Sequence, residues 1–385
     1  MKAARVTEAL IGNMIAEPVF SEQGNMLLKE GVVINQHVLD KLLIHEIDYV
    51  YIFDALMQGI EPTSLVDEEK LQESVTVVKN VFDDVLHNER MGVKASLSKK
   101  DVKLVKAVVE DLIKELESAE NILYTVVDLI GTDAYTYKHS VNVTVLSIIV
   151  SRALGYEQID IKNIAMGALL HDIGKVRVEP ELILKPGKLT FEERQRVELH
   201  PSYGYELLEA IEGLSYTTKQ IILLHHEKID GSGYPYGLRG IEIPEYVRIV
   251  TVCDMYDAMT TDRVYRNKMP IYRAFDILMA EAIYRIDPII YSILLDNIAV
   301  YPVGTGIILS DGRVGVVVDY RHKNPARPIV RVLNTSLNSD NINIEHIDLE
   351  KSQVLFIEDV WDVRATKEER REAVEKKRKS KVTFN

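Results

Sequence analysis

Nearly half of the chain carries one helical pattern of apolar residues. Between residues 119 and 298, apolar side chains recur at spacings of three and four, whereas strand alternation and hairpin turns are scarce. This pattern predicts an all-α core. Since the chain has 385 residues and domains run to roughly 100–200 residues, we expect two or three folding units.

The segments that flank this core differ from it in pattern. Residues 1–54 combine strand-like runs with a short amphipathic helix, and they predict a small α/β accessory unit. Residues 299–350 contain turn signals and apolar strands, which indicate a small β-barrel-like unit or a sheet. Residues 351–385 are expected to form a charged tail.

Residues 55–118 are acidic and helical by pattern. Two interpretations stay open for them. They form either a connector that pairs with another helix or a second chain, or the first helices of the core domain at 119–298. A homodimer through this region is one expectation, although no sustained heptad repeat requires it.

Composition excludes several classes of protein. The formal net charge of −13 disfavours binding to long nucleic acid, which needs a broad basic surface. The single cysteine, Cys253, rules out an internal disulfide framework and a cysteine-based metal site. We see no signal-peptide pattern and no run of the ~20 apolar residues that span a bilayer. A cytoplasmic protein without a membrane span is therefore expected.

Histidines gather in the predicted helical core. Of the ten in the chain, five fall in this region: His139, His171, His200, His225 and His226. His171 is followed at once by Asp172, and Asp254 comes later on the same predicted core. One such histidine alone would more often be a packed core residue. Five histidines with two aspartates are poorly explained by packing, because a buried carboxylate needs a cation or a proton.

Imidazole nitrogens and carboxylate oxygens suit iron, manganese, zinc or cobalt. A carboxylate can also bridge two ions, and a pair of ions can activate water and polarise a phosphodiester. The lysine that follows the His-Asp pair, Lys175, is suited to contact a phosphate. The pattern therefore favours metal-assisted hydrolysis of a phosphate ester.

The segment from 225 to 244 contains four glycines and two prolines. So many turn residues directly after two candidate ligands predict a loop with a fixed path, which can shape one wall of a substrate pocket. A simple connection between two helices rarely needs this length.

At these positions the sequence resembles the HD-GYP family, a branch of the HD superfamily of metal-dependent phosphohydrolases. The first match is His171-Asp172-Ile173-Gly174-Lys175. The second is His-His-Glu-x-x-Asp-Gly-x-Gly-Tyr-Pro-x-Gly-Leu from His225, and the third begins at Asp254 and runs to Arg266. The resemblance implies an all-α HD-type core that hydrolyses cyclic di-GMP to linear pGpG, GMP or both, and so lowers the level of this second messenger.

The resemblance also implies a set of site residues. The metal ligands it implies are His139, His171, Asp172, His200, His225, His226 and Asp254. Asp172 would bridge two ions and, with Lys175, act in catalysis. Substrate contacts would come from Lys175, Gly233, Tyr234, Pro235, Arg263 and Arg266. Two divalent transition-metal ions per chain are expected, iron or manganese above other metals.

One position departs from the family pattern. Some members hold a third metal with a glutamate four residues before the first histidine, where this chain has Tyr135. We therefore expect a binuclear site. Asp230 and Asp257 are candidates to orient ligating histidines from behind.

Two other functions compete with cyclic di-GMP hydrolysis. One is an HD-type phosphohydrolase that acts on nucleotides. The other is a non-catalytic module that binds a cyclic dinucleotide or a partner protein. Degenerate family members lose ligands or the glycine-rich loop, and this chain retains both, which favours the enzyme.

Overall fold

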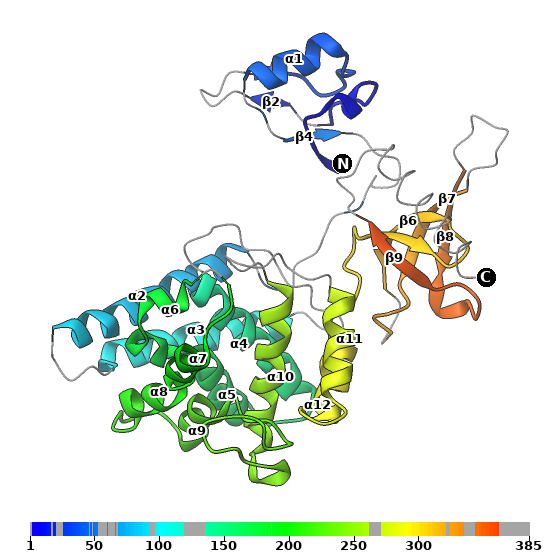
Figure 1. Ribbon diagram of the computed structural model, residues 1–385. Coiled ribbons are helices and arrows are strands. Elements are labelled where there is room, and N and C mark those ends of the chain that lie inside the picture. The colour runs from blue at the N-terminus through cyan, green and yellow to red at the C-terminus, as the bar shows by residue number, and fades with distance from the viewer. Residues whose placement is uncertain are drawn as a thin grey trace. The chain divides into compact units, whose positions relative to one another are not determined.

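The computed structural model of the chain separates two compact units, residues 64–300 and the flanking segments 1–63 with 301–385. Figure 1 shows the helices of the first unit gathered around α4, α5 and α10. The structure describes residues 2–16, 18–20, 26–45, 47, 49–52, 60, 66, 68–91, 97–118, 135–185, 187–261, 271–320, 324–334 and 343–361.

The N-terminal segment has the small α/β character predicted for it. Its elements are β1 (Lys2–Arg5), η1 (Glu8–Leu10), β2 (Val19–Phe20), β3 (Met26–Leu28), α1 (Gln36–Ile44) and β4 (Tyr49–Ile52). β1 pairs with β4 and β2 pairs with β3, both antiparallel. The Asn35 side chain accepts a hydrogen bond from the Val38 amide and starts α1, which buries Leu39 and Leu42 against the strands.

The central unit is helical, as predicted. Its elements are α2 (Glu68–Arg90), α3 (Lys99–Ser118), α4 (Tyr135–Ala153), α5 (Gln158–Leu170), η2 (Ile173–Arg177), α6 (Pro180–Ile183), α7 (Phe191–Val197), α8 (His200–Leu208), α9 (Tyr216–Leu224), η3 (Gly240–Glu242), α10 (Glu245–Thr260), α11 (Ile271–Glu281) and α12 (Pro288–Asn297). Among the described helices, none is long and apolar enough to cross a membrane.

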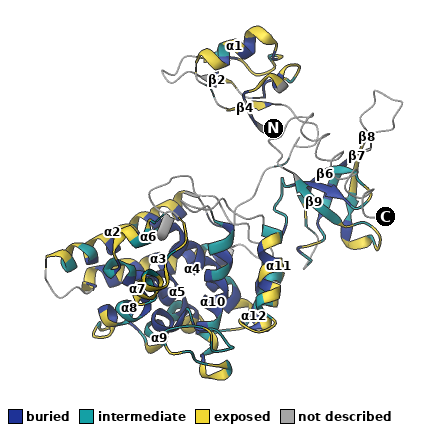
Figure 2. Cartoon of the chain, viewed as in Figure 1, coloured by how far each residue is buried: buried dark blue, intermediate teal, exposed yellow. Residues whose placement is uncertain are grey.

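Helices α4, α5 and α10 form the centre of this unit. Each is buried over most of its circumference, because apolar residues cover all sides rather than one stripe (Figure 2). α4 packs against α5 and α10, and α5 packs against α9. α2 and α3 lie on α4 and α5, so the helices of residues 68–118 are part of the core unit.

Glycines allow these helices to meet closely. A β-carbon on Gly174 would lie 1.9 Å from the carbonyl oxygen of His200, so only glycine lets η2 approach the start of α8. A β-carbon on Gly167 would lie 2.7 Å from Ile221, where α5 crosses α9. These contacts bring the ends of three helices to one place, and the candidate ligands stand at those ends.

The C-terminal segment is a five-stranded antiparallel sheet in the order β8-β7-β6-β5-β9. Its elements are β5 (Gly306–Leu309), β6 (Val314–Asp319), β7 (Ile329–Asn334), β8 (Asn343–Asp348), η4 (Leu349–Lys351) and β9 (Ile357–Trp361). Of the two forms expected for this unit, a barrel-like unit or a sheet, the structure has the sheet and not the barrel. Among the described strands, β8 and β9 do not pair with each other, so the sheet remains open.

The sheet also extends beyond the expected limit of the β unit. β9 pairs with β5 from Gly306 opposite Trp361, although residues 351–385 were assigned to a charged tail. Glu358 and Asp359 interrupt the apolar residues of β9, and its register with β5 shifts between Ile308 and Leu309, so no simple alternation marks this strand in the sequence. Residues 362–385 lie outside the described part of the chain.

Candidate metal centre

Seven histidine and aspartate side chains converge where α4, α5, α8, α9 and α10 meet. They form two groups, and within each group one ligand atom per residue lies within 4.8 Å of the others. We name Asp172, His200, His225 and His226 the first group, and His139, His171 and Asp254 the second group. The structure therefore brings together all seven residues that the family resemblance implied as metal ligands.

Three of the histidines are oriented by main-chain carbonyls. His171, His200 and His225 each contact, through Nδ1, the carbonyl oxygen three residues earlier, at 2.7, 2.8 and 3.0 Å. Those carbonyls lie in the last turns of α5, α7 and α9, where helical carbonyls lack a partner within the helix. When Nδ1 donates this hydrogen bond, Nε2 is left free to bind a cation. We call these three the helix-end histidines.

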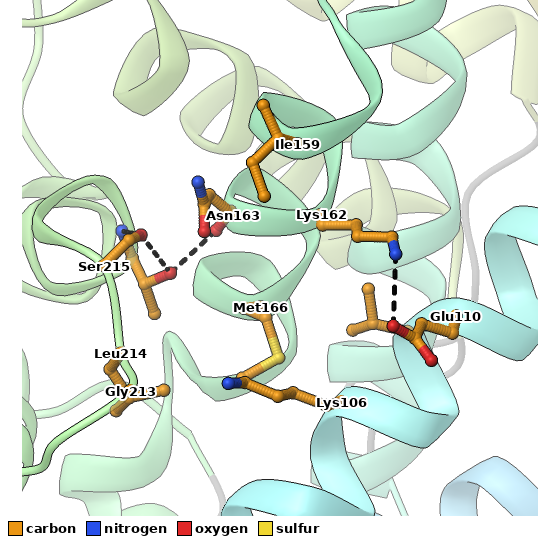
Figure 3. A pocket seen from close by; sticks show the side chains of 11 residues that line it. Lys106, Glu110, Ile159, Lys162, Asn163, Met166, Gly213, Leu214 and Ser215 are labelled. Atoms are coloured by element: carbon orange, nitrogen blue, oxygen red, sulfur yellow. Dashed lines mark hydrogen bonds and ion pairs between the residues drawn. The ribbon is translucent and has the colours of Figure 1, made fainter.

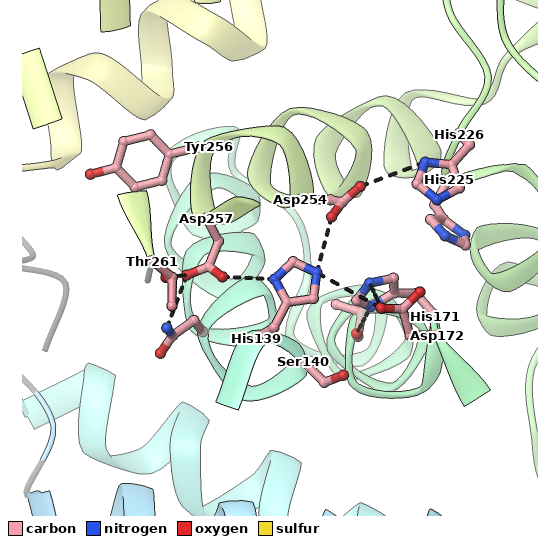
Figure 4. A network of polar contacts seen from close by, with 12 residues as sticks. His139, Ser140, His171, Asp172, His225, His226, Asp254, Tyr256, Asp257 and Thr261 are labelled. Carbon is pink, nitrogen blue, oxygen red and sulfur yellow. Dashed lines mark hydrogen bonds and ion pairs between the residues drawn. The ribbon is translucent and has the colours of Figure 1, made fainter. Parts of the chain in front are cut away.

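His139 is oriented by side chains instead. Its Nδ1 lies 2.7 Å from Oδ2 of Asp257, which is fully buried on α10 (Figure 4). The other oxygen of Asp257 accepts hydrogen bonds from Asn142 Nδ2 at 2.9 Å and from Thr261 Oγ1 at 3.0 Å. Asp257 therefore lies behind a candidate ligand, in the place that the sequence suggested for it.

Asp172 lies between the two groups. Its Oδ1 is 3.3 Å from His200 Nε2, whereas its Oδ2 is 3.4 Å from His171 Nε2 and 3.9 Å from His139 Nε2. The ammonium of Lys175 is 2.5 Å from Oδ2, and the lysine side chain is 29% exposed. Asp172 is thus the carboxylate best placed to contact both groups, with a cation at its outer side.

Asp254 also faces both groups. Figure 4 shows it between His139 and His226. Its Oδ1 is 3.1 Å from Nε2 of His139, and its Oδ2 is 3.7 Å from Nδ1 of His226.

Burial and neighbouring charges shift the pKa values of the aspartates and histidines at the centre in different directions. Burial opposes ionisation of both carboxyls, yet Lys175 and His171 hold the pKa of Asp172 well below its usual range. His139 and His226 act in the same way on the pKa of Asp254. Burial, and then neighbouring imidazoles, lower the pKa of His225 and His226 well below the usual value. These four groups therefore take the forms that bind cations.

His139 behaves differently from His225 and His226. Burial alone would lower its pKa, but hydrogen bonds to Asp254 and Asp257 outweigh that effect and raise the pKa to about 9. In the chain without a metal, the His139 ring therefore holds a proton near neutral pH.

The loop after His226 is fixed by a buried carboxylate that sequence reasoning missed. Glu227 accepts hydrogen bonds from the amides of Tyr236, Gly237 and Leu238, at 2.7, 3.2 and 2.9 Å. Only the fold shows that Glu227 points away from the histidines and into the loop.

Gly233 and Tyr234 place this loop against the metal centre. A β-carbon on Gly233 would lie 2.4 Å from the backbone nitrogen of Lys228, so the turn requires glycine. The ring of Tyr234 then packs on His226, with centroids 4.7 Å apart. Burial raises the pKa of Tyr234, so its phenol stays neutral. Pro235 follows in the same half-exposed loop segment.

Among the described residues, Asp230 is not brought to the centre. Asp230 accepts from the amide and hydroxyl of Ser232 at 2.9 and 2.6 Å, and orients no histidine among the described residues. It stabilises a turn of the loop instead. Arg263 and Arg266 lie outside the described residues, as does the side chain of Tyr135.

Comparison with known proteins agrees with this geometry. Residues 99–290 match the family described as HD domain, and residues 307–369 match the family described as KOW domain associated with HD domain. The helical unit with its buried histidine and aspartate groups is therefore an HD domain.

Three similar proteins are all named as phosphodiesterases of cyclic dinucleotides. Cyclic di-GMP phosphodiesterase PA4108 of Pseudomonas aeruginosa is 35% identical over 62% of this chain and 58% of its own length. A 3'3'-cGAMP-specific phosphodiesterase 3 of Vibrio cholerae is 36% identical over 44% of this chain and 36% of its own. A cyclic di-GMP phosphodiesterase of Thermotoga maritima is 34% identical over 50% of this chain and 52% of its own. The chain thus spans about half, or less, of these relatives, and it belongs to the HD-GYP branch of the HD domain family.

Proposed function

We propose that the chain is a metal-dependent phosphodiesterase that opens a cyclic dinucleotide, with cyclic di-GMP as its substrate. The observation that carries this proposal is the convergence of seven histidine and aspartate side chains in two adjacent groups. The relatives named as cyclic di-GMP phosphodiesterases support the substrate class. Linear pGpG, GMP or both are the proposed products.

The donor set fits two divalent transition-metal ions. Nε2 of His171 and Oδ1 of Asp172 are buried and have no hydrogen-bond partner among the described residues. Desolvated polar atoms of this kind are costly unless a ligand contacts them. Imidazoles with carboxylates, and no thiolate, suit iron or manganese. One ion would be held by the first group and the other by the second group, with Asp172 shared between them.

The residues of the chain would each have a distinct role in the reaction. Bound divalent ions supply an activated water and neutralise charge on the phosphodiester. The helix-end histidines keep Nε2 directed at the centre, and Asp257 does the same for His139. Lys175, half-exposed beside Asp172, would pair with a phosphate oxygen and stabilise the charge that develops in the transition state.

The loop that follows His226 would form one wall of the substrate site. Tyr234 would contact the substrate from its position on His226, and Gly233 and Pro235 would set the path of the loop. Glu227 would keep that wall rigid through its three amide contacts. Arg263 and Arg266 would add cations for the second phosphate.

Hydrolysis by purified protein tests the proposal. Protein loaded with Mn²⁺ or Fe²⁺ is incubated with cyclic di-GMP, and the products are separated by chromatography. We expect linear dinucleotide or GMP, and no product after chelation of the metal. 3'3'-cGAMP is run in parallel, because one relative is specific for it. Binding of cyclic di-GMP without cleavage by metal-loaded protein would instead support a binding module.

A further inference from the structure

A hollow that is separate from the metal centre lies near the start of α5, away from the end that carries His171. It has a volume of about 480 Å³ and is bounded by α3, α5 and residues 213–218 at the start of α9. This volume is within the range of about 300–1,000 Å³ that is typical of small-molecule sites. In Figure 3, Lys106 from α3 and Met166 from α5 point toward one another across it.

The hollow carries one cation that is not neutralised. Lys162 forms an ion pair with Glu110, with 3.1 Å between Nζ and Oε1. Lys106 has no ion pair or hydrogen bond within the described part of the chain, and its Nζ lies 3.5 Å from where a β-carbon on Gly213 would stand. The hollow therefore has two ammonium groups and one carboxylate, an excess of positive charge on a chain whose net charge is −13.

The remaining walls offer an apolar face and a hydrogen-bonding edge. Met166 and Leu214 are buried, and Ile159 is 64% exposed at the rim. The side-chain amide of Asn163 makes no hydrogen bond among the described residues, although its backbone carbonyl accepts from Thr218 Oγ1 at 2.9 Å. An amide presents one donor and one acceptor, which suits the edge of a nucleobase.

We propose that this hollow binds a nucleoside monophosphate. The phosphate would pair with the ammonium of Lys106, the base would lie against Met166 and Leu214, and Asn163 would bond the edge of the base. Each part of a nucleoside monophosphate, namely its phosphate, the face of its base and the edge of its base, thus has a matching group in the hollow.

The position of the hollow links it to the metal centre. Asn163 lies at the hollow on α5, and His171 follows the end of this helix, roughly 12 Å further along at about 1.5 Å per residue. On α9, Thr218 likewise lies at the hollow, and His225 and His226 follow the end of the helix. The two helices touch at Gly167 and Ile221. A ligand bound between the N-terminal parts of α5 and α9 would change the distance between the two helices. It would therefore shift the histidines at their C-terminal ends and change the affinity of the centre for its metals. This coupling, unlike the binding, rests on the proposed function.

Binding is tested by calorimetry on the full chain after metal removal, with GMP and AMP as probes. We expect one site per chain, with inorganic phosphate, guanosine and decanoate each binding more weakly. Lys106→Glu should weaken binding about tenfold or more, because it removes a charged hydrogen bond. Lys103→Glu, on the same helix but not in the hollow, is the matched control and should leave binding unchanged. Equal affinity of the wild type and Lys106→Glu, or tighter binding of decanoate, would overturn the site.

The coupling is tested by Mn²⁺ titration with and without saturating GMP. We expect the apparent Mn²⁺ affinity to change about fivefold or more. The change should vanish in Lys106→Glu, which separates it from GMP that binds at the metal centre. A change that persists in this variant, or none in the wild type, would overturn the coupling.

Discussion

The helix-end histidines and His139 reach the same centre by different means. His171, His200 and His225 take their orientation from carbonyls at helix ends, whereas His139 takes it from Asp257. A carbonyl stays in place when any single side chain is replaced, but Asp257 can be removed by one substitution. We infer that metal binding near His139 is the more fragile half of the site.

The largest effect is expected at Asp172, because its carboxylate contacts histidines of both groups. Asp172→Ala should abolish hydrolysis and lower metal content at both groups, because one carboxylate lies between them. Metal content is measured by mass spectrometry beside the rate. Asp230→Ala is the control, since Asp230 contacts Ser232 and Arg285 and orients no histidine among the described residues. A variant at Asp172 with full metal content and a near-normal rate would rule out its bridging role.

Lys175 should separate catalysis from metal binding. Lys175→Ala should retain both metals and slow hydrolysis by about 10²-fold, because its ammonium would act on transition-state charge and not as a ligand. Lys185→Ala removes a lysine that pairs with Glu193 on the surface, and its rate should stay normal. Loss of metal from Lys175→Ala would show a structural role instead.

Asp257 tests the fragile half alone. Asp257→Asn should weaken metal binding at the second group by about 10–100-fold and leave the first group occupied. Metal titration followed by mass spectrometry should then give one tight and one weak site. Thr261→Val removes one of the contacts to Asp257 and should have a smaller effect. Equal loss from both groups would contradict the separation into two halves.

Proton release should also differ between the halves. At pH 8 the His139 ring, with its pKa raised to about 9, still holds a proton that a cation must displace. His225 and His226, with pKa values lowered by burial, are neutral there. Metal affinity at the second group should therefore rise with pH up to about 9. Mn²⁺ calorimetry in two buffers at pH 8 should show less proton release for Asp257→Asn than for the wild type, and an identical release would count against the argument.

The sequence predicted the helical core, the residues that converge in it and the place of Asp257 behind a ligand, but not how the other histidines are held. Spacing and residue type suggested the ligands because a buried carboxylate among histidines needs a cation. The sequence left a barrel and an open sheet as alternatives, because closure depends on whether edge strands meet, which apolar patterning does not encode. The carbonyls behind the helix-end histidines could not be predicted either, since they depend on where each helix stops. The role of Glu227 and the need for Gly174 arise from contacts between distant segments.

The number and place of the bound ions test the account most directly. Tyr135 stands at the position where the resemblance to the HD-GYP family implies a glutamate ligand in some members, and a phenol with a pKa near 10 is a poor ligand at neutral pH. Crystals of protein loaded with manganese or iron should therefore show two anomalous peaks, one at each group, and Tyr135→Glu should add a third. Three strong peaks in the unmodified protein, or no peak beside Asp172, would contradict the two-metal centre proposed for this chain.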